Sequence, residues 1–126
     1  MDLQGLIQAD DNKLRIVQEL VPGKQVTLAH IIANPEPILY KKMGLNPSVD
    51  YSKASIGIVT MTPAETAIIA GDIAMKASGA EIGFVDRFSG TLIITGTVSA
   101  VETAVNAVVD YLQHTLKFTI VGITKT

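Results

Sequence analysis

Two histidines are the side chains of this sequence best suited to acid–base chemistry. His30 stands within the apolar run VTLAHIIA (26–33), and no carboxylate or hydroxyl lies at a spacing that suggests a catalytic triad. His114 lies near the C-terminal end of an expected helix, where the helix dipole favours a positive charge. We therefore predict structural or interface roles for both histidines rather than catalytic ones.

The remaining patterns do not complete a catalytic or phosphate-binding site. Gly23-Lys24 is not a phosphate-binding loop, because Gln18 stands where the first glycine is needed and Gln25 follows the lysine. The sequence contains no cysteine, which excludes a thiol nucleophile, a disulfide and a cysteine-held metal. Nothing assembles a nucleophile, a base and oxyanion donors. The sequence thus predicts a protein that is not an enzyme and holds no cofactor or metal.

The segment EIGFVDRFSGTLIITG (81–96) carries a conspicuous loop between two apolar runs. The runs predict the two strands of a hairpin, and Asp86 and Gly90 would suffice for its turn. Arg87 and Phe88 exceed what the turn needs, so this tip is a candidate functional loop, with an ordinary polar loop as the alternative.

The composition limits the possible classes of function further. The 126 residues predict one domain; 48% are apolar and only 17% charged, so we expect other subunits to cover part of the surface. The net charge of −2 argues against a nucleic-acid partner. No apolar run reaches the roughly 18 residues of a membrane span, and residues 1–13 lack a signal-peptide pattern. We therefore expect a cytosolic protein that contacts neither nucleic acid nor membrane.

From residue 54 onward the apolar pattern predicts the order β-α-β-β-α-β, which is the ferredoxin-like arrangement of the α+β class. Four strands are expected, at 54–61, 81–86, 91–96 and 117–124. The first helix ends at Gly79 and carries a stripe of alanines. The second helix has apolar residues at helical spacing, which are Val101, Val105, Val108, Leu112 and Leu116.

The helix starts are predicted from capping residues. Thr62-Pro63-Ala64-Glu65 matches a capping box with proline at the first helical position. For the second helix, a capping box at Ser99–Glu102 (99–102) competes with Thr97 as the cap. Asn34 is expected to cap a short helix over 36–43, with Pro35 at its first position.

Two strands are expected ahead of this unit, at 14–21 and 24–33. The strand at 14–21 shows weak burial on either face. Residues 1–13 are expected to be a flexible lead-in. A single domain is therefore predicted over 14–126.

Residues 55–105, SIGIVTMTPAETAIIAGDIAMKASGAEIGFVDRFSGTLIITGTVSAVETAV, resemble the shell-protein domain of bacterial microcompartments. The shared features are IGIV before a helix, the D-x-x-x-K-A helix end (72–77), the S-G hairpin tip (89–90) and G-x-V-x-A-V (96–101). Ordinary members place a strand of the form V-x-V-H-V-I-P-R-P-H at the C-terminal end. Its look-alike here is VTLAHIIANPE (26–36), so the chain resembles the circularly permuted members. The chain is similar to the small permuted shell proteins of ethanolamine, propanediol or choline utilisation compartments.

The resemblance implies flat cyclic homohexamers that tile into a polyhedral shell around enzymes in the bacterial cytosol. Lys76, paired with Asp72 four residues earlier, matches the lysine at the hexamer edge. Asn34 stands where ordinary members carry an edge arginine, which implies less efficient tiling. Arg87, Phe88, Ser89 and Gly90 match the loop that points toward the six-fold axis, where Arg87 would attract anions or pair with Asp86.

The resemblance also assigns a role to the first expected strand. Leu14, Ile16, Gln18 and Leu20 match the segment that gathers in permuted members into a small β-barrel over the axis. The resemblance leaves two possibilities for residues 117–124. They either complete the ferredoxin-like sheet as its last strand, or residues 25–33 occupy that position and 117–124 become an edge.

The function expected from the sequence is therefore that of a structural shell subunit. Its partners would be further copies of itself in a homohexamer, other microcompartment shell proteins and encapsulated enzymes, at the compartment shell within the cytoplasm. The alternative is an oligomeric small-molecule-binding regulatory module, because ferredoxin-like domains often bind metabolites and a fold alone does not decide function.

Overall fold

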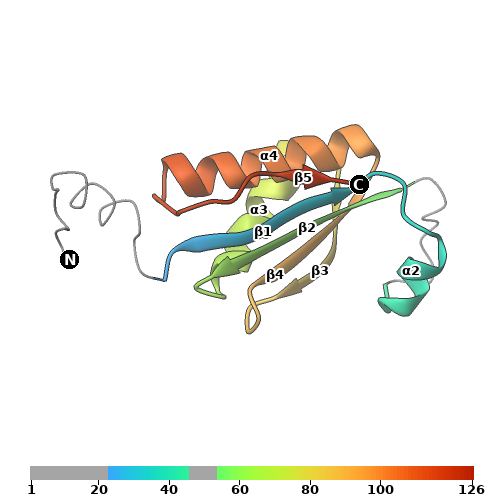
Figure 1. The fold of residues 1–126 in the computed structure, drawn as a ribbon, viewed down its shortest axis with the longest axis horizontal. Coiled ribbons are helices and arrows are strands. Elements are labelled where there is room, and N and C mark those ends of the chain that lie inside the picture. Colours follow the sequence, from blue (N-terminus) through green and yellow to red (C-terminus); the bar gives the residue numbers. More distant parts are fainter. Residues whose placement is uncertain (1–22, 46–53) are drawn as a thin grey trace, which may run out of the picture.

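The structure is a computed structural model that describes residues 23–45 and 54–126. The predicted lead-in (1–13) and first strand (14–21) lie outside the described residues, as does most of the predicted loop at 45–53. Figure 1 shows the arrangement of the elements. These are β1 (Gln25–Ile32), α2 (Ile38–Lys42), β2 (Ser55–Thr62), α3 (Thr66–Ala77), β3 (Glu81–Asp86), β4 (Thr91–Gly96), α4 (Val98–His114) and β5 (Thr124–Lys125).

One sheet of five strands forms the centre of the described chain, in the order β3-β4-β2-β1-β5. β2 pairs antiparallel with both β1 and β4, and β3 pairs antiparallel with β4. β5 lies parallel to β1 at the far edge. The predicted α+β class is confirmed, and β1 rather than the C-terminal segment lies beside β2.

Helices α3 and α4 cover one face of this sheet (Figure 1). Val101, Val105, Val108 and Leu112 are buried along α4, as their spacing predicts. α4 ends at His114, so Leu116 follows the helix and is only partly buried. Gly57 of β2 lets α4 approach closely, since a Cβ there would lie 2.9 Å from Cγ1 of Val101 and 2.9 Å from Cγ2 of Val105.

The other face of the sheet is covered only at one end, by α2 and the residues after it. Tyr40 and Leu45 pack there against Ile56, and the Tyr40 hydroxyl donates to the carbonyl of Ala54 at 2.7 Å. The hairpin tip lies at the opposite end of the sheet (Figure 1). We call the helix-free face of the sheet the open face.

Two of the predicted helix caps are wrong. Thr62 is the last residue of β2 and pairs with Gln25, so α3 begins later, at Thr66 after Glu65. Asn34 makes no cap either, because α2 begins only at Ile38, and its cap position is held by Pro37 without a side-chain bond. In both cases the preceding strand or a turn occupies residues that local pattern alone would place in the helix.

The start of α4 resolves the competition between two caps. Thr97 is the cap, and its side-chain oxygen accepts the backbone N–H of Ala100 at 3.2 Å. Ser99 lies inside the first turn of α4.

The predicted strand at 117–124 is mostly wrong. Only Thr124–Lys125 forms a strand there, with one isolated bridge between Thr119 and Gln25. Lys117 adopts a positive φ of 63°, and Ile120 and Ile123 pack against the core. The segment therefore lies at the edge of the sheet, beside β1, and we call residues 117–126 the C-terminal strap. This is the second of the two possibilities left open by the sequence.

Candidate functional site

The tip of the β3–β4 hairpin is organised by the carboxylate of Asp86. Its Oδ1 accepts the backbone N–H of Phe88 at 2.8 Å, and its Oδ2 accepts the hydroxyl of Ser89 at 2.8 Å. The hydrogen bond from Phe88 lowers the pKa of Asp86 below its usual value the most, and the bond from Ser89 lowers it further. The nearby charge of Arg87 adds a smaller lowering. Asp86 thus closes the loop as an Asx turn at the end of β3.

Gly90 anchors the same loop to the end of β2. Its φ of +75° lies in the left-handed region, and a Cβ there would lie 2.1 Å from the carbonyl oxygen of Met61. Its own carbonyl accepts the backbone N–H of Met61 at 2.8 Å. Only glycine fits this close approach. The contact with β2 therefore requires a glycine at the last position of the loop.

Arg87 and Phe88 form the outermost part of the tip. The guanidinium carbon of Arg87 lies 4.6 Å from the centroid of the Phe88 ring, which is a cation–π distance. The Phe88 residue is 78% exposed. The alternative in which Arg87 pairs with Asp86 is not found, since no ion pair in the described part of the chain includes Arg87.

The Lys76–Asp72 pair lies near the end of α3. The ammonium of Lys76 is 2.8 Å from Oδ2 of Asp72, and both side chains are largely exposed. The hydrogen bond to Asp72, and then its charge, raise the pKa of Lys76. Asn34 lies exposed after β1, and within residues 23–45 and 54–126 no hydrogen bond or ion pair joins it to Lys76.

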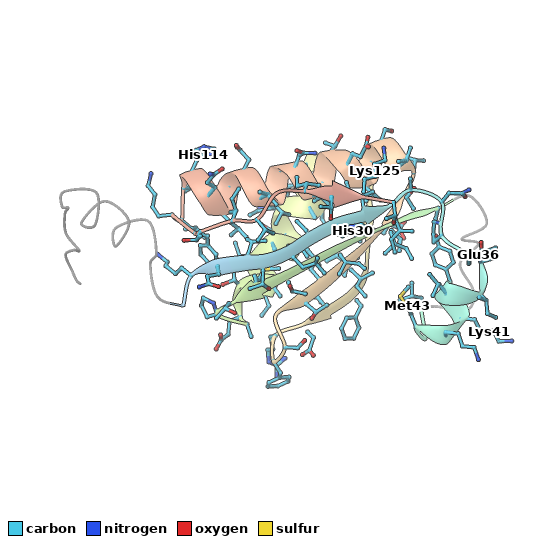
Figure 2. The ribbon with its side chains drawn as sticks, in the orientation of Figure 1. His30, Glu36, Lys41, Met43, His114 and Lys125 are labelled. Atoms are coloured by element: carbon cyan, nitrogen blue, oxygen red, sulfur yellow. The ribbon has the colours of Figure 1, made fainter. Side chains whose placement is uncertain are left out.

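His30 holds the C-terminal strap, a role that the sequence pattern did not specify. Its Nδ1 lies 2.6 Å from the hydroxyl of Thr124, and its Nε2 lies 2.9 Å from the hydroxyl of Thr126. Figure 2 shows His30 on β1 beside the strap. The partners lie more than 90 residues further along the chain, so only the parallel pairing of β1 and β5 brings them together. His114 pairs with Asp110 within α4.

The chain matches known shell proteins over most of its length. The sequence pattern described as the BMC domain matches residues 55–123. The bacterial microcompartment shell protein EutS of Salmonella typhimurium is 56% identical over 114 residues, covering 90% of this chain and 98% of that protein. The chain belongs to the BMC domain family.

Two further BMC shell proteins support the assignment. The bacterial microcompartment shell protein PduU of Salmonella typhimurium is 54% identical over 112 residues, covering 89% of this chain and 93% of that protein. The solved flat hexamer of CutR has a TM-score of 0.76 and 45% identity, covering 84% of this chain and 94% of the CutR chain. The family resemblance seen in the sequence is therefore confirmed.

The residues that the sequence singled out fall into separate places on this BMC domain. The tip (87–90) lies at one end of the sheet, and α2 lies at the other. Leu14, Ile16, Gln18 and Leu20 lie outside the described residues. No helix of the described chain is long and apolar enough to cross a membrane. In the same residues, no three His, Asp or Glu side chains cluster as metal ligands.

Proposed function

We propose that this chain is a structural shell subunit of a bacterial microcompartment, which assembles as a cyclic homohexamer and tiles with other shell proteins. The observation that carries the proposal is the match to a CutR chain solved as a flat hexamer, since it covers 84% of this chain and 94% of the CutR chain. Light scattering on the purified chain tests it. A mass of six chains supports the ring, and a monomer at working concentration would refute it.

The position of β1 supports a circular permutation of the BMC domain. The matched pattern begins at β2, yet β1 lies ahead of it in sequence and fills the place beside β2 in the sheet. In a β-α-β-β-α-β unit that place belongs to the last strand. The C-terminal strap, displaced to the edge, forms only two residues of strand. The proposed permutation explains why the predicted C-terminal strand is so short.

The hairpin tip is the proposed axial element of the ring. Six copies of the tip would place six guanidinium groups and six phenyl rings around one axis, where the rings narrow the opening and the cations favour anions. The turn bonds of Asp86 and the contact of Gly90 with Met61 hold each tip in one shape, which such a ring requires.

Residues 14–21 are the proposed cap of that axis. A lone strand with two weakly apolar faces has an unpaired edge, whereas six copies closed into a barrel have none. Leu14, Ile16, Gln18 and Leu20 are two positions apart, so they would share one face of the barrel strand, with Arg15, Val17 and Glu19 on the other face.

Lys76 is the proposed contact at the hexamer edge, where its exposed ammonium would pack against the neighbouring ring. Asn34 would contribute to the same edge in place of an arginine. The proposed place of action is the shell of the compartment in the bacterial cytoplasm, with encapsulated enzymes as further partners and no catalytic role for the shell subunit itself.

A further inference from the structure

The C-terminal strap covers the outer edge of β1. Without the strap, β1 would be an edge strand, because β2 pairs with its other side only. The sequence of β1 is QVTLAHII, which has no Asp, Glu, Lys or Arg, no proline and no glycine. Charge-free segments of this length with high strand propensity readily add to one another edge to edge. β1 therefore needs cover on this side.

The opposite edge of the sheet is protected in a different way. β3 has no further strand of the described chain beside it, but it begins at Glu81 and ends at Asp86. Its pairing with β4 also shifts register between Ile82 and Phe84. Charges and irregular register on an edge strand oppose pairing with another chain. β1 lacks such charges, so its protection depends on the strap.

The strap is joined to the backbone of β1 at two separate places. At the first, the backbone N–H of Val26 donates to the carbonyl of Thr119 at 2.8 Å. At the second, the backbone N–H of Thr126 donates to the carbonyl of Ile31 at 2.8 Å. Residues 120–123 lie between these places and form no strand, and β5 itself has only two residues. Sheet pairing alone thus holds only short stretches of the strap.

The side chain of His30 fastens the second place. Its Nδ1 lies 2.6 Å from the hydroxyl of Thr124, and its Nε2 lies 2.9 Å from the hydroxyl of Thr126. The Thr124 hydroxyl donates to the carbonyl of Ala29 at 3.4 Å, so it accepts from Nδ1–H of the neutral imidazole. The Thr126 hydroxyl then donates to Nε2. One imidazole therefore holds two residues of the strap at the same time.

Further contacts tie the strap to the helix layer and the core (Figure 1). The ammonium of Lys125 lies 2.5 Å from Oε2 of Glu102 on α4. Phe118 is buried, and Ile120 and Ile123 pack against the core. The outer side of the strap offers little to a further strand, because β5 is very short and one of its two residues is a lysine.

We infer that the C-terminal strap is an autoinhibitory cover, which stops β1 of one copy of this chain from pairing with β1 of another copy. His30 keeps the cover closed. Once the strap is released, the backbone N–H and C=O groups on the outer side of β1 lose their partners, and a second uncovered copy can satisfy them. A second β1 fits this edge because identical strands without charge bring no like charges together. The inference does not depend on the proposed hexamer, since each subunit carries its own strap.

His30→Ala tests the cover. Thr124 and Thr126 are exposed, so their hydroxyl groups can bond to water and the subunit should keep its fold. We expect the helical circular dichroism signal to persist. The chain should nevertheless shift from the supernatant to the pellet on centrifugation and should bind thioflavin T, a dye that reports stacked strands.

His114→Ala is the matched control, because it removes the other histidine, whose ion pair with Asp110 lies within α4. This variant and the wild-type chain should stay in the supernatant without binding the dye. The double variant Thr124→Ala/Thr126→Ala opens the same contact from the strap and leaves β1 unchanged. It should pellet as His30→Ala does, and it replaces that variant if His30→Ala fails to fold.

A charge placed in β1 makes the test specific for this edge. Leu28 is 41% exposed, so the subunit should tolerate Leu28→Lys. Lysines on two paired copies of β1 would oppose their pairing. We therefore expect the double variant His30→Ala/Leu28→Lys to return to the supernatant.

Four outcomes would overturn the inference. If His30→Ala and the double threonine variant both stay soluble, the strap is not what blocks pairing. Equal pelleting of His114→Ala would point to general destabilisation. Pelleting that persists after Leu28→Lys would mean that a surface other than β1 associates. A soluble dimer that does not bind the dye would mean that straps exchange between two copies while the edges stay covered.

Discussion

The guanidinium of Arg87 lies over the ring of Phe88, with 4.6 Å between the guanidinium carbon and the ring centroid. The pair stands at the end of a loop whose shape is set elsewhere, by Asp86 and by the contact of Gly90 with β2. The exposed side chains and the residues that hold the loop are thus separate, so they can be changed independently.

Replacing Arg87 by alanine should alter the proposed axis without unfolding the chain. The side chain lies over the exposed Phe88 ring and forms no ion pair within the described residues, and exposed substitutions of this kind change the free energy of unfolding by about 0.5 kcal/mol or less. Thermal melting and light scattering measure the two effects. A large fall in melting temperature would make Arg87 a structural residue.

The contribution of Asp86 to stability should depend on pH. Its pKa in the folded loop lies below the usual value of 3.8, so the charged form is favoured by folding. That stabilisation is fully present above pH 3.8 and is lost as the pH falls through the lower, folded pKa. We expect the melting-temperature gap between wild type and Asp86→Ala to be widest at neutral pH and to narrow in acid. A gap independent of pH would contradict the assignment.

Gly57→Ala should destabilise the subunit. The added methyl group would lie 2.9 Å from both Val101 and Val105, so α4 must move away from β2. Overpacking of this kind costs about 1–3 kcal/mol in the free energy of unfolding. Urea denaturation at fixed protein concentration measures it.

Gly79→Ala is the control for that substitution, because no atom lies within 4 Å of its added methyl group. Its effect should stay within about 0.5 kcal/mol. Equal losses from the two substitutions would show that the close approach of α4 is not the cause.

Lys76→Ala should preserve the hexamer and weaken the sheets or tubes that hexamers form. The side chain is exposed and its ion pair in the described subunit is with Asp72, one helical turn away, so its proposed role lies between rings. Electron microscopy under assembly conditions checks the result, with the exposed Lys41→Ala on α2 as a control. Unchanged sheet assembly would count against the edge role.

Deleting residues 1–21 should leave a hexamer whose axis is open. The strands and core residues that the structure describes all follow the deleted segment, since β1 begins at Gln25. Light scattering reports the ring, and cryo-electron microscopy reports the axial density. Loss of the hexamer would show that the proposed barrel is needed for assembly and is more than a cap.

Most elements and the family could be predicted from the sequence. The spacing of Val101, Val105, Val108 and Leu112 predicts the buried face of α4, and the runs on either side of the DRFSG loop predict the hairpin. These features depend on residues a few positions apart, which is the range over which periodicity carries information. The predicted caps at Thr62 and Asn34 are wrong because a strand pairing occupies the first position and a turn the second. The local sequence pattern records neither.

The sequence by itself determined the α+β class, the hairpin with its Arg87-Phe88 tip and the membership of the BMC family. Only the tertiary structure decided that β1 lies beside β2, that His30 holds Thr124 and Thr126, and that apolar side chains remain exposed on both faces of β3. The physical reason is that a strand carries its own pattern of faces but not the identity of its partner. Partner choice depends on packing between segments up to about a hundred residues apart, which no local pattern records.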